Sequence, residues 1–246
     1  MISALWKFRT VKGDVHMMKK KILASLLVGS AVVGASLAPL SAQAVTTGNT
    51  PVTVGFEGGT LPNDENPSGT SKAPDPDAVN TDFDLIVIPV GFNFNNIKLS
   101  GPLTNIPASN STQVYGVGDL RGTKAGWHVT AEIKEMKNGT DLLQGKLNFN
   151  QVMTYAKYND PRYPGNDYSF YDSADGDPAA PSGIASNLSI GGGATLMAQA
   201  EAGKGQGIWG FNMRESTLDV TSSVSNIRIG NYTGNITWNL VAGPSI

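Results

Sequence analysis

The fold of this chain is decided by the stretch Asn231-Tyr-Thr-Gly-Asn-Ile-Thr-Trp-Asn-Leu-Val-Ala-Gly-Pro244. Successive side chains of an extended strand point to opposite faces, so Ile236, Trp238 and Leu240 share one face. The residues between these three are polar. Such an alternation predicts a β-strand that is half buried.

An earlier stretch, residues 126–133, repeats this arrangement. One face carries an apolar stripe, and the other carries polar side chains: Trp127, Val129, Ala131 and Ile133 against His128, Thr130 and Glu132. Each of the two tryptophans therefore stands in the apolar stripe of a predicted strand.

Short apolar segments separated by turn residues continue along most of the chain. They predict strands at 85–90, 113–117, 188–190, 194–198, 208–213, 218–220 and 225–229. Asn138-Gly139 predicts a hairpin with a type I′ turn, followed by a return strand with Leu143, Leu147 and Phe149 on one face. Outside the N-terminal leader no long segment has the 3.6-residue apolar period of a helix. The fold class is therefore predicted as all-β, a single sandwich or barrel-like domain.

The first 44 residues are predicted to lie outside the fold. Residues 1–44 comprise an upstream extension and a secretory signal peptide, with Lys19-Lys20-Lys21, an apolar run at 22–38 and the cleavage signature Ala42-Gln43-Ala44. An uncleaved membrane anchor is the less favoured alternative, because the apolar run contains several Gly and Ser residues. Cleavage would produce an exported protein without further membrane insertion.

Residues 45–81 are predicted to form a short strand and a linker before the β domain at 82–246. Val52, Val54 and Phe56 alternate with small or polar residues, so we expect a strand that pairs with an edge of the main sheet. Residues 58–81 are rich in Pro, Gly, Asn and Asp, which predicts a flexible segment.

Composition excludes several functional classes. The chain has no cysteine, so disulfides and thiol chemistry are absent. Without the leader, 12 Lys and Arg stand against 19 Asp and Glu, 12 minus 19 giving a net charge of −7. A nucleic-acid partner is not expected, and long-range charge attraction to other anionic polymers or to anionic lipid is not expected either.

No catalytic residue or cofactor is predicted. His128 is the single histidine after the leader, and no G-x-S-x-G nucleophile motif accompanies it. No His or Cys cluster offers a transition-metal site. A pair of carboxylates for glycoside hydrolysis stays open as a weak alternative, since their separation in space is not readable from sequence.

Asp172, Asp175 and Asp177 surround Gly176 and form a weak candidate for binding a hard cation through oxygen atoms. Their spacing differs from that of the EF-hand loop. A solvated acidic turn is the favoured interpretation.

A tyrosine-rich stretch at 155–171 is a second candidate binding element. Aromatic faces beside amides and carboxylates suit a neutral sugar ring, which stacks through its C–H groups and uses its hydroxyls for hydrogen bonds. The alternative is that these rings only pin a long loop to the domain. The tyrosines are Tyr155, Tyr158, Tyr163, Tyr168 and Tyr171.

The two tryptophan segments resemble those of the WxL-domain proteins of low-GC Gram-positive bacteria. Trp238-Asn239-Leu240 matches the second Trp-x-Leu motif of that family, and Trp127-His128-Val129 resembles the first with Val in place of Leu. The flanking segments 88–94, 119–127 and 203–209 are similar too. The resemblance implies a secreted cell-surface protein whose β domain attaches it non-covalently to peptidoglycan.

Two questions stay open at this stage. The resemblance also allows an accessory subunit that binds a membrane-anchored partner protein, or host matrix, rather than the wall directly. It implies that the motif residues are needed for wall binding, but Trp127 and Trp238 are expected either in the core or in contact with the ligand, with the core favoured.

Overall fold

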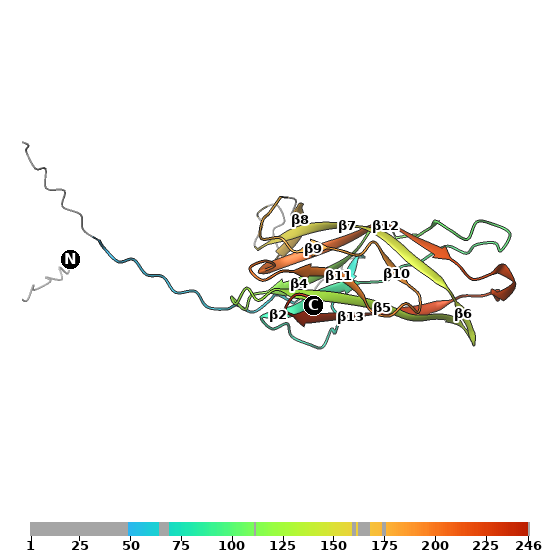
Figure 1. Ribbon diagram of the computed structural model, residues 1–246, viewed down its shortest axis with the longest axis horizontal. Helices are drawn as coiled ribbons and strands as arrows, with labels where there is room; N and C mark the ends of the chain where they lie inside the picture. The colour runs from blue at the N-terminus through green and yellow to red at the C-terminus, as the bar shows by residue number, and fades with distance from the viewer. Residues whose placement is uncertain are drawn as a thin grey trace, which may run out of the picture. The chain divides into compact units, whose positions relative to one another are not determined.

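Two antiparallel β-sheets make up the fold of the chain (Figure 1). The computed structural model describes residues 49–63, 69–110, 112–158, 161, 168–173 and 176–245, without side chains at 157, 158 and 168–173. Residues from Thr53 onward belong to one compact unit. The all-β prediction is confirmed.

The larger sheet, called here the large sheet, is built around three long strands. Its order is β1 (Ser71–Lys72), β2 (Phe83–Pro89), β4 (Thr112–Asp119), β12 (Gly207–Val220), β7 (Gly145–Tyr158) and β10 (Asn187–Ser189). Two further strands join it, β3 (Ile106–Pro107) beside β12 and β8 (Tyr168–Ser173) beside β7.

The second sheet, called here the small sheet, holds both tryptophan segments. Its order is β13 (Thr233–Ala242), β5 (Trp127–Asn138), β11 (Thr195–Ala200) and β9 (Ser182–Gly183), and β6 (Asp141–Leu143) also pairs with β5. The strands predicted around Trp127 and Trp238 are therefore adjacent, as Figure 1 shows.

Three predicted strands near the C-terminus need correction. The segments 208–213 and 218–220 form one strand, β12, with an irregularity between Arg214 and Thr217. The strand predicted at 225–229 is wrong, because a 3₁₀ turn, η1 (Val224–Asn226), occupies its start and residues 227–229 are not in a strand. The serines and Asn226 in this segment favour turns over strands, which outweighs its two isoleucines.

The hairpin at Asn138 is confirmed, but its turn differs from the prediction. Asn138 pairs with Asp141, so Gly139 and Thr140 are the central residues. Gly139 has φ 64° and Asn138 is not in the positive-φ region, which is the pattern of a turn with Gly first. After Leu143 the chain leaves the small sheet, and β7 pairs with β12.

The core lies between the inward faces of the two sheets. Trp127, Val129 and Ala131 of β5 are buried, as the alternation predicted. They pack with buried side chains of β4, β7, β11 and β12, among them Tyr115, Leu147, Met197, Trp209 and Phe211. Ile236, Trp238 and Leu240 of β13 pack against this cluster from its margin.

The strand predicted at Val52 to Phe56 is absent. Residues 49–60 contain no strand, and Val54 and Phe56 are 75% and 90% exposed. Apolar alternation defines the two faces of a strand but supplies no neighbour for it, and Gly58-Gly59, which disfavours a strand, follows the segment.

The segment 58–81 is packed at two places, contrary to the flexible linker expected there. Leu61 is buried over Gly118, where a Cβ would approach its side chain to 2.3 Å. The N–H of Leu61 donates to the carbonyl oxygen of Thr81 at 2.9 Å. Strand β1 then pairs with β2.

In the ranges that the structure describes, no helix is long and apolar enough to span a membrane.

Candidate functional site

The two tryptophan motifs lie side by side in the ladder between β5 and β13. Val129 is the Cα partner of Leu240, and Ala131 is the partner of Trp238. Opposite residues of an antiparallel pair point to the same face, so Val129 and Leu240 both face the core. Each motif therefore places its first and third residues inward and its second residue outward.

Trp127, the first residue of β5, is fixed in the core by a hydrogen bond and by close packing. Its side chain is fully buried, and its indole Nε1–H donates to the carbonyl oxygen of Gly205 at 2.9 Å. Gly205 has φ 74°, and a Cβ there would lie 2.6 Å from the indole nitrogen. The glycine-rich stretch at 203–209 thus shapes itself around the indole edge, which only glycine permits.

A chain of aromatic contacts links the two motif tryptophans through the core. Trp127 meets Phe211 edge-on at 6.2 Å, and Phe211 stacks on Tyr115 at 4.6 Å. Tyr115 in turn lies 4.8 Å from Trp238. Burial raises the pKa of Tyr115 well above its usual value, and its hydroxyl donates to Oε1 of Gln151 at 2.7 Å. A change at either tryptophan is therefore transmitted to the core of both sheets.

The stretch before the first motif is fixed by an ion pair. Arg121 donates from Nε to Oδ1 of Asp119 at 2.9 Å and from Nη2 to Oδ2 at 2.7 Å. The Asp119 carboxylate, to which Arg121 is hydrogen-bonded, raises the pKa of the guanidinium, which also covers the ring of Phe83 at 3.7 Å. Nη2 reaches the carbonyl oxygen of Gly126 at 3.2 Å. This two-pronged pair sets the entry of the chain into β5.

The outward residues of the motifs have smaller roles in the structure. Nδ1 of His128 lies 2.9 Å from the carbonyl oxygen of Gly243, which ties the end of β13 to the start of β5. Asn239 is exposed. Both residues stay candidates for wall contact.

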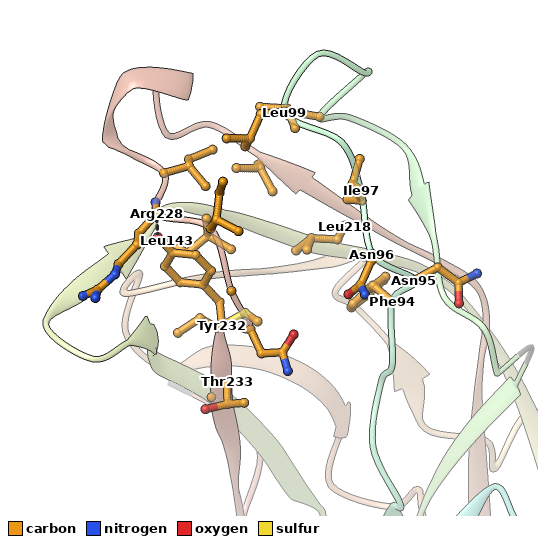
Figure 2. Close-up of a pocket in the computed structure, with 18 of the residues that line it drawn as sticks. Phe94, Asn95, Asn96, Ile97, Leu99, Leu143, Leu218, Arg228, Tyr232 and Thr233 are labelled. Carbon is orange, nitrogen blue, oxygen red and sulfur yellow. Dashed lines mark hydrogen bonds between the residues drawn. The ribbon is translucent and has the colours of Figure 1, made fainter.

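A cleft of about 750 Å³ opens at the end of the domain where β5 turns into β6 (Figure 2). Residues of the β2–β3 connection, including Phe94 and Asn96, form one wall. The segment before β13, including Arg228 and Tyr232, forms the other, and Leu218 of β12 lies between them. We call this hollow the end cleft.

The floor of the end cleft is apolar and its rim is polar. The floor consists of buried or half-buried side chains from a small apolar cluster separate from the main core: Leu103, Leu143, Leu218, Val220, Ile227 and Tyr232. The rim carries the amides of Asn96 and Asn231, and within the described residues neither amide makes a hydrogen bond. None of the residues that line this cleft is Asp or Glu.

Asp219 holds the wall formed by the β2–β3 connection. Its Oδ1 accepts a hydrogen bond of 2.7 Å from the N–H of Asn105, and its Oδ2 accepts one of 3.0 Å from Nδ2 of Asn148. The bond from Asn105, followed by that from Asn148, lowers the pKa of Asp219. The N–H of the next residue, Val220, donates to the carbonyl oxygen of Leu103 at 2.7 Å, so β12 holds the end of the β2–β3 connection.

The tyrosine-rich stretch is only partly described. Tyr155 is 37% exposed and meets Trp209 edge-on at 5.3 Å. Tyr158, Tyr168 and Tyr171 lie in β7 and β8 without described side chains, and Tyr163 lies outside the described residues. The loop at 155–171 therefore remains a candidate for glycan stacking.

The acidic turn is likewise only partly described. Asp172 is the Cα partner of Tyr155 in the ladder between β7 and β8, without a described side chain, and Asp175 lies outside the described residues. Oδ1 of Asp177 accepts a hydrogen bond from the N–H of Ala179 at 2.8 Å, as in a polar turn. Among the described residues no group of three His, Cys, Asp or Glu side chains could hold a metal ion.

Several residues that line the end cleft lie in segments identified in the sequence as strands or motif flanks, but none was predicted to belong to a binding site. The walls of the cleft come from segments far apart in the chain, residues 92–103 and 227–234. The one visible signal was the asparagine-rich stretch at 93–96 beside Phe92 and Phe94.

Comparison with protein families gives one match. A family model described as WxL domain surface cell wall-binding matches residues 43–244. No curated protein and no solved structure matches the chain.

Proposed function

The chain belongs to the WxL family of surface cell wall-binding domains, and from this premise we propose that it binds peptidoglycan non-covalently through the end cleft. Membership of this family places the protein at the cell surface, on the cell wall. The polymer, peptidoglycan, and the place where it binds, the end cleft, are our inference. We infer likewise that the chain is a secreted binding protein without catalytic function.

The observation that carries this proposal is the composition of the end cleft. The chain is acidic, yet no carboxylate lines this hollow. Aromatic and aliphatic side chains form its floor, and the amides of Asn96 and Asn231 on its rim make no hydrogen bond to any described residue. Apolar surfaces with a few placed amides are what sugar rings and short peptides require for specific binding.

The size and charge of the end cleft agree with such a ligand. Small-molecule sites are commonly about 300 to 1,000 Å³, and the end cleft has about 750 Å³. Nη1 of Arg228 forms an exposed ion pair of 3.7 Å with Oδ2 of Asp141, and the side chain, 65% exposed at the rim, offers further donors to a carboxylate of a wall peptide. Binding of this kind depends on contact rather than on long-range attraction.

In this proposal the motif tryptophans do not contact the ligand but hold the strands that line the end cleft. Trp127 is buried, and Trp238 packs on Tyr115 and fixes β13, whose first residues line the end cleft. In this proposal Trp127, Val129, Trp238 and Leu240 position the site, and His128 and Asn239 remain candidates for contact. The alternative role is an accessory subunit bound to a membrane-anchored partner or host matrix.

Sedimentation with purified Gram-positive walls, stripped of protein, tests the proposal. We expect the chain from residue 45 onward to sediment with these walls and to release no reducing sugar from them. A chain that stays in the supernatant with stripped walls, but sediments with walls that keep their proteins, would favour the accessory-subunit role. Release of reducing sugar would contradict the non-catalytic assignment.

A further inference from the structure

Three large apolar side chains near the N-terminus are left in water. Val52, Val54 and Phe56 are 91%, 75% and 90% exposed. Apolar side chains gain free energy when they leave water, and these three recur at every second residue, as on one face of a strand. The segment therefore has the pattern of a strand but no sheet to join in the structure.

Strand β13 offers an unpaired edge. In the described part of the chain its only neighbouring strand is β5. Its ten residues, 233–242, include no charged residue and no proline. Exposed edge strands are usually protected by charges, prolines or shortness, and β13 has none of these. By contrast, the edge strands β1, β9 and β10 have only two or three residues each.

Two hollows follow the inner face of β13 on the side of β2. Each has a volume of about 270 Å³. The apolar lining of the first includes Ile88, Val90, Phe92, Ile236 and Trp238, and that of the second includes Val79, Phe83, Leu85 and Leu240, with Asp75, Asn80 and Asp84 also lining the second. Apolar side chains that entered beside β13 would fill these hollows and cover the margin of the core.

The N-terminal segment and this edge match in length and pattern. Five residues of a strand span about 14 Å, which holds both for 52–56 and for the stretch from Ile236 to Leu240. Each stretch has three inward positions at alternate residues. We propose that Val52 to Phe56 of one copy of this chain pairs with the edge of β13 in a second copy and places its apolar side chains in the two hollows.

We take a second copy as the occupant because Val54 and Phe56 are 75% and 90% exposed, while the hollows beside β13 are open. Donor segment and acceptor edge are different surfaces of the same chain. Such a head-to-tail contact produces open chains or closed rings of copies rather than a symmetric dimer. Peptide recognition by strand addition follows the same physics.

Sedimentation velocity over a range of concentrations tests this association with the chain from residue 45 onward. Val54→Asp and Phe56→Asp each place a charge on the apolar face of the segment, and we expect each to weaken self-association at least about tenfold. Thr53→Asp adds the same charge to the opposite face and is the matched control, which we expect to associate like the unchanged chain. All three positions are exposed, so the fold is unaffected.

A synthetic peptide of residues 49–58, added to the isotope-labelled Val54→Asp variant, locates the acceptor by NMR. We expect the amide signals of residues 236–240 to shift. Three results would overturn the proposal: an unchanged chain that is monomeric at every concentration, equal association of the Thr53→Asp and Val54→Asp variants, or peptide shifts confined to another edge. If the chain is monomeric and Val54→Asp nevertheless shifts the amide signals of residues 236–240, the segment pairs with β13 of the same chain instead.

Discussion

Val129 and Leu240, the third residues of the two tryptophan motifs, are Cα partners on the neighbouring strands β5 and β13. Both side chains face the core, where Val129 is fully buried and Leu240 lies at the margin. The valine that departs from the Trp-x-Leu pattern therefore stands directly opposite the leucine that conforms to it. Side chains directly opposite each other in a ladder are close enough to interact, so we infer that the two positions share space.

This shared space predicts coupling between substitutions at the two positions. Val129→Leu adds a methylene to a fully packed site and should cost about 1 to 3 kcal/mol. Leu240→Val removes one and should cost about 1 kcal/mol. The double variant should be more stable than the sum of the two losses by at least about 0.5 kcal/mol in urea unfolding. Strict additivity would show that the two side chains do not share space.

Gly205 should be intolerant of any side chain because of its close approach to Ala200 and Trp127. Gly205→Ala brings a methyl group to 2.3 Å from the Cβ of Ala200 and 2.6 Å from the indole nitrogen of Trp127, at a backbone φ of 74° that disfavours alanine, so we expect a loss of about 2 to 5 kcal/mol. Gly203→Ala is the matched control, since it has φ 91° but nothing within 4 Å, and should lose only about 1 to 2 kcal/mol. Equal losses in chemical denaturation would contradict the close approach to Trp127.

Trp238→Ala should destabilise the domain and weaken wall binding only through unfolding. The side chain is half buried against Tyr115, so we expect a loss of about 3 kcal/mol, at the lower end of the range for buried aromatic residues. Thermal unfolding and wall sedimentation should be measured on the same samples. A variant that keeps its melting temperature but no longer binds would instead make Trp238 a contact residue.

Acid should weaken the clamp that Asp219 forms on the wall of the end cleft. The pKa of Asp219 is lowered in the folded state by the N–H of Asn105 and the amide of Asn148. The carboxylate therefore contributes its full stability above the pKa of an unfolded Asp, about 3.9, and loses it as pH falls through the lower folded value. Asp219→Asn removes this contribution.

We therefore expect the stability difference between the unchanged chain and Asp219→Asn to be constant near neutral pH and to shrink below about pH 4. Urea unfolding at a series of pH values measures this difference. A difference that grows on acidification would have the wrong sign for a carboxylate with a lowered pKa.

Single-strand patterns were well predicted from the sequence. The alternation around Trp127 and Trp238 correctly gave the buried faces of β5 and β13, because burial of one face is a property of the strand itself. Asn138-Gly139 likewise marked the hairpin, although the turn begins one residue later.

Pairing partners could not be predicted in the same way. The chain changes sheet after Leu143, and the alternating segment at 52–56 has no neighbour, because the same side-chain pattern fits any free edge. The end cleft was missed for a related reason. Asn96 and Asn231 stand in loops, and only the tertiary fold places these loops around one apolar floor.

The most direct test of the account is the affinity for stripped walls of the double variant Asn96→Ala and Asn231→Ala. Both amides lie on the rim of the end cleft and make no described hydrogen bond, so their removal leaves the fold intact. Asn150→Ala, at an exposed position of β7 outside this cleft, is the control. The account predicts that the double variant loses at least about tenfold in affinity, corresponding to about 1.4 kcal/mol, while the control binds like the unchanged chain. Unchanged binding of the folded double variant would contradict the end cleft as the wall-binding site.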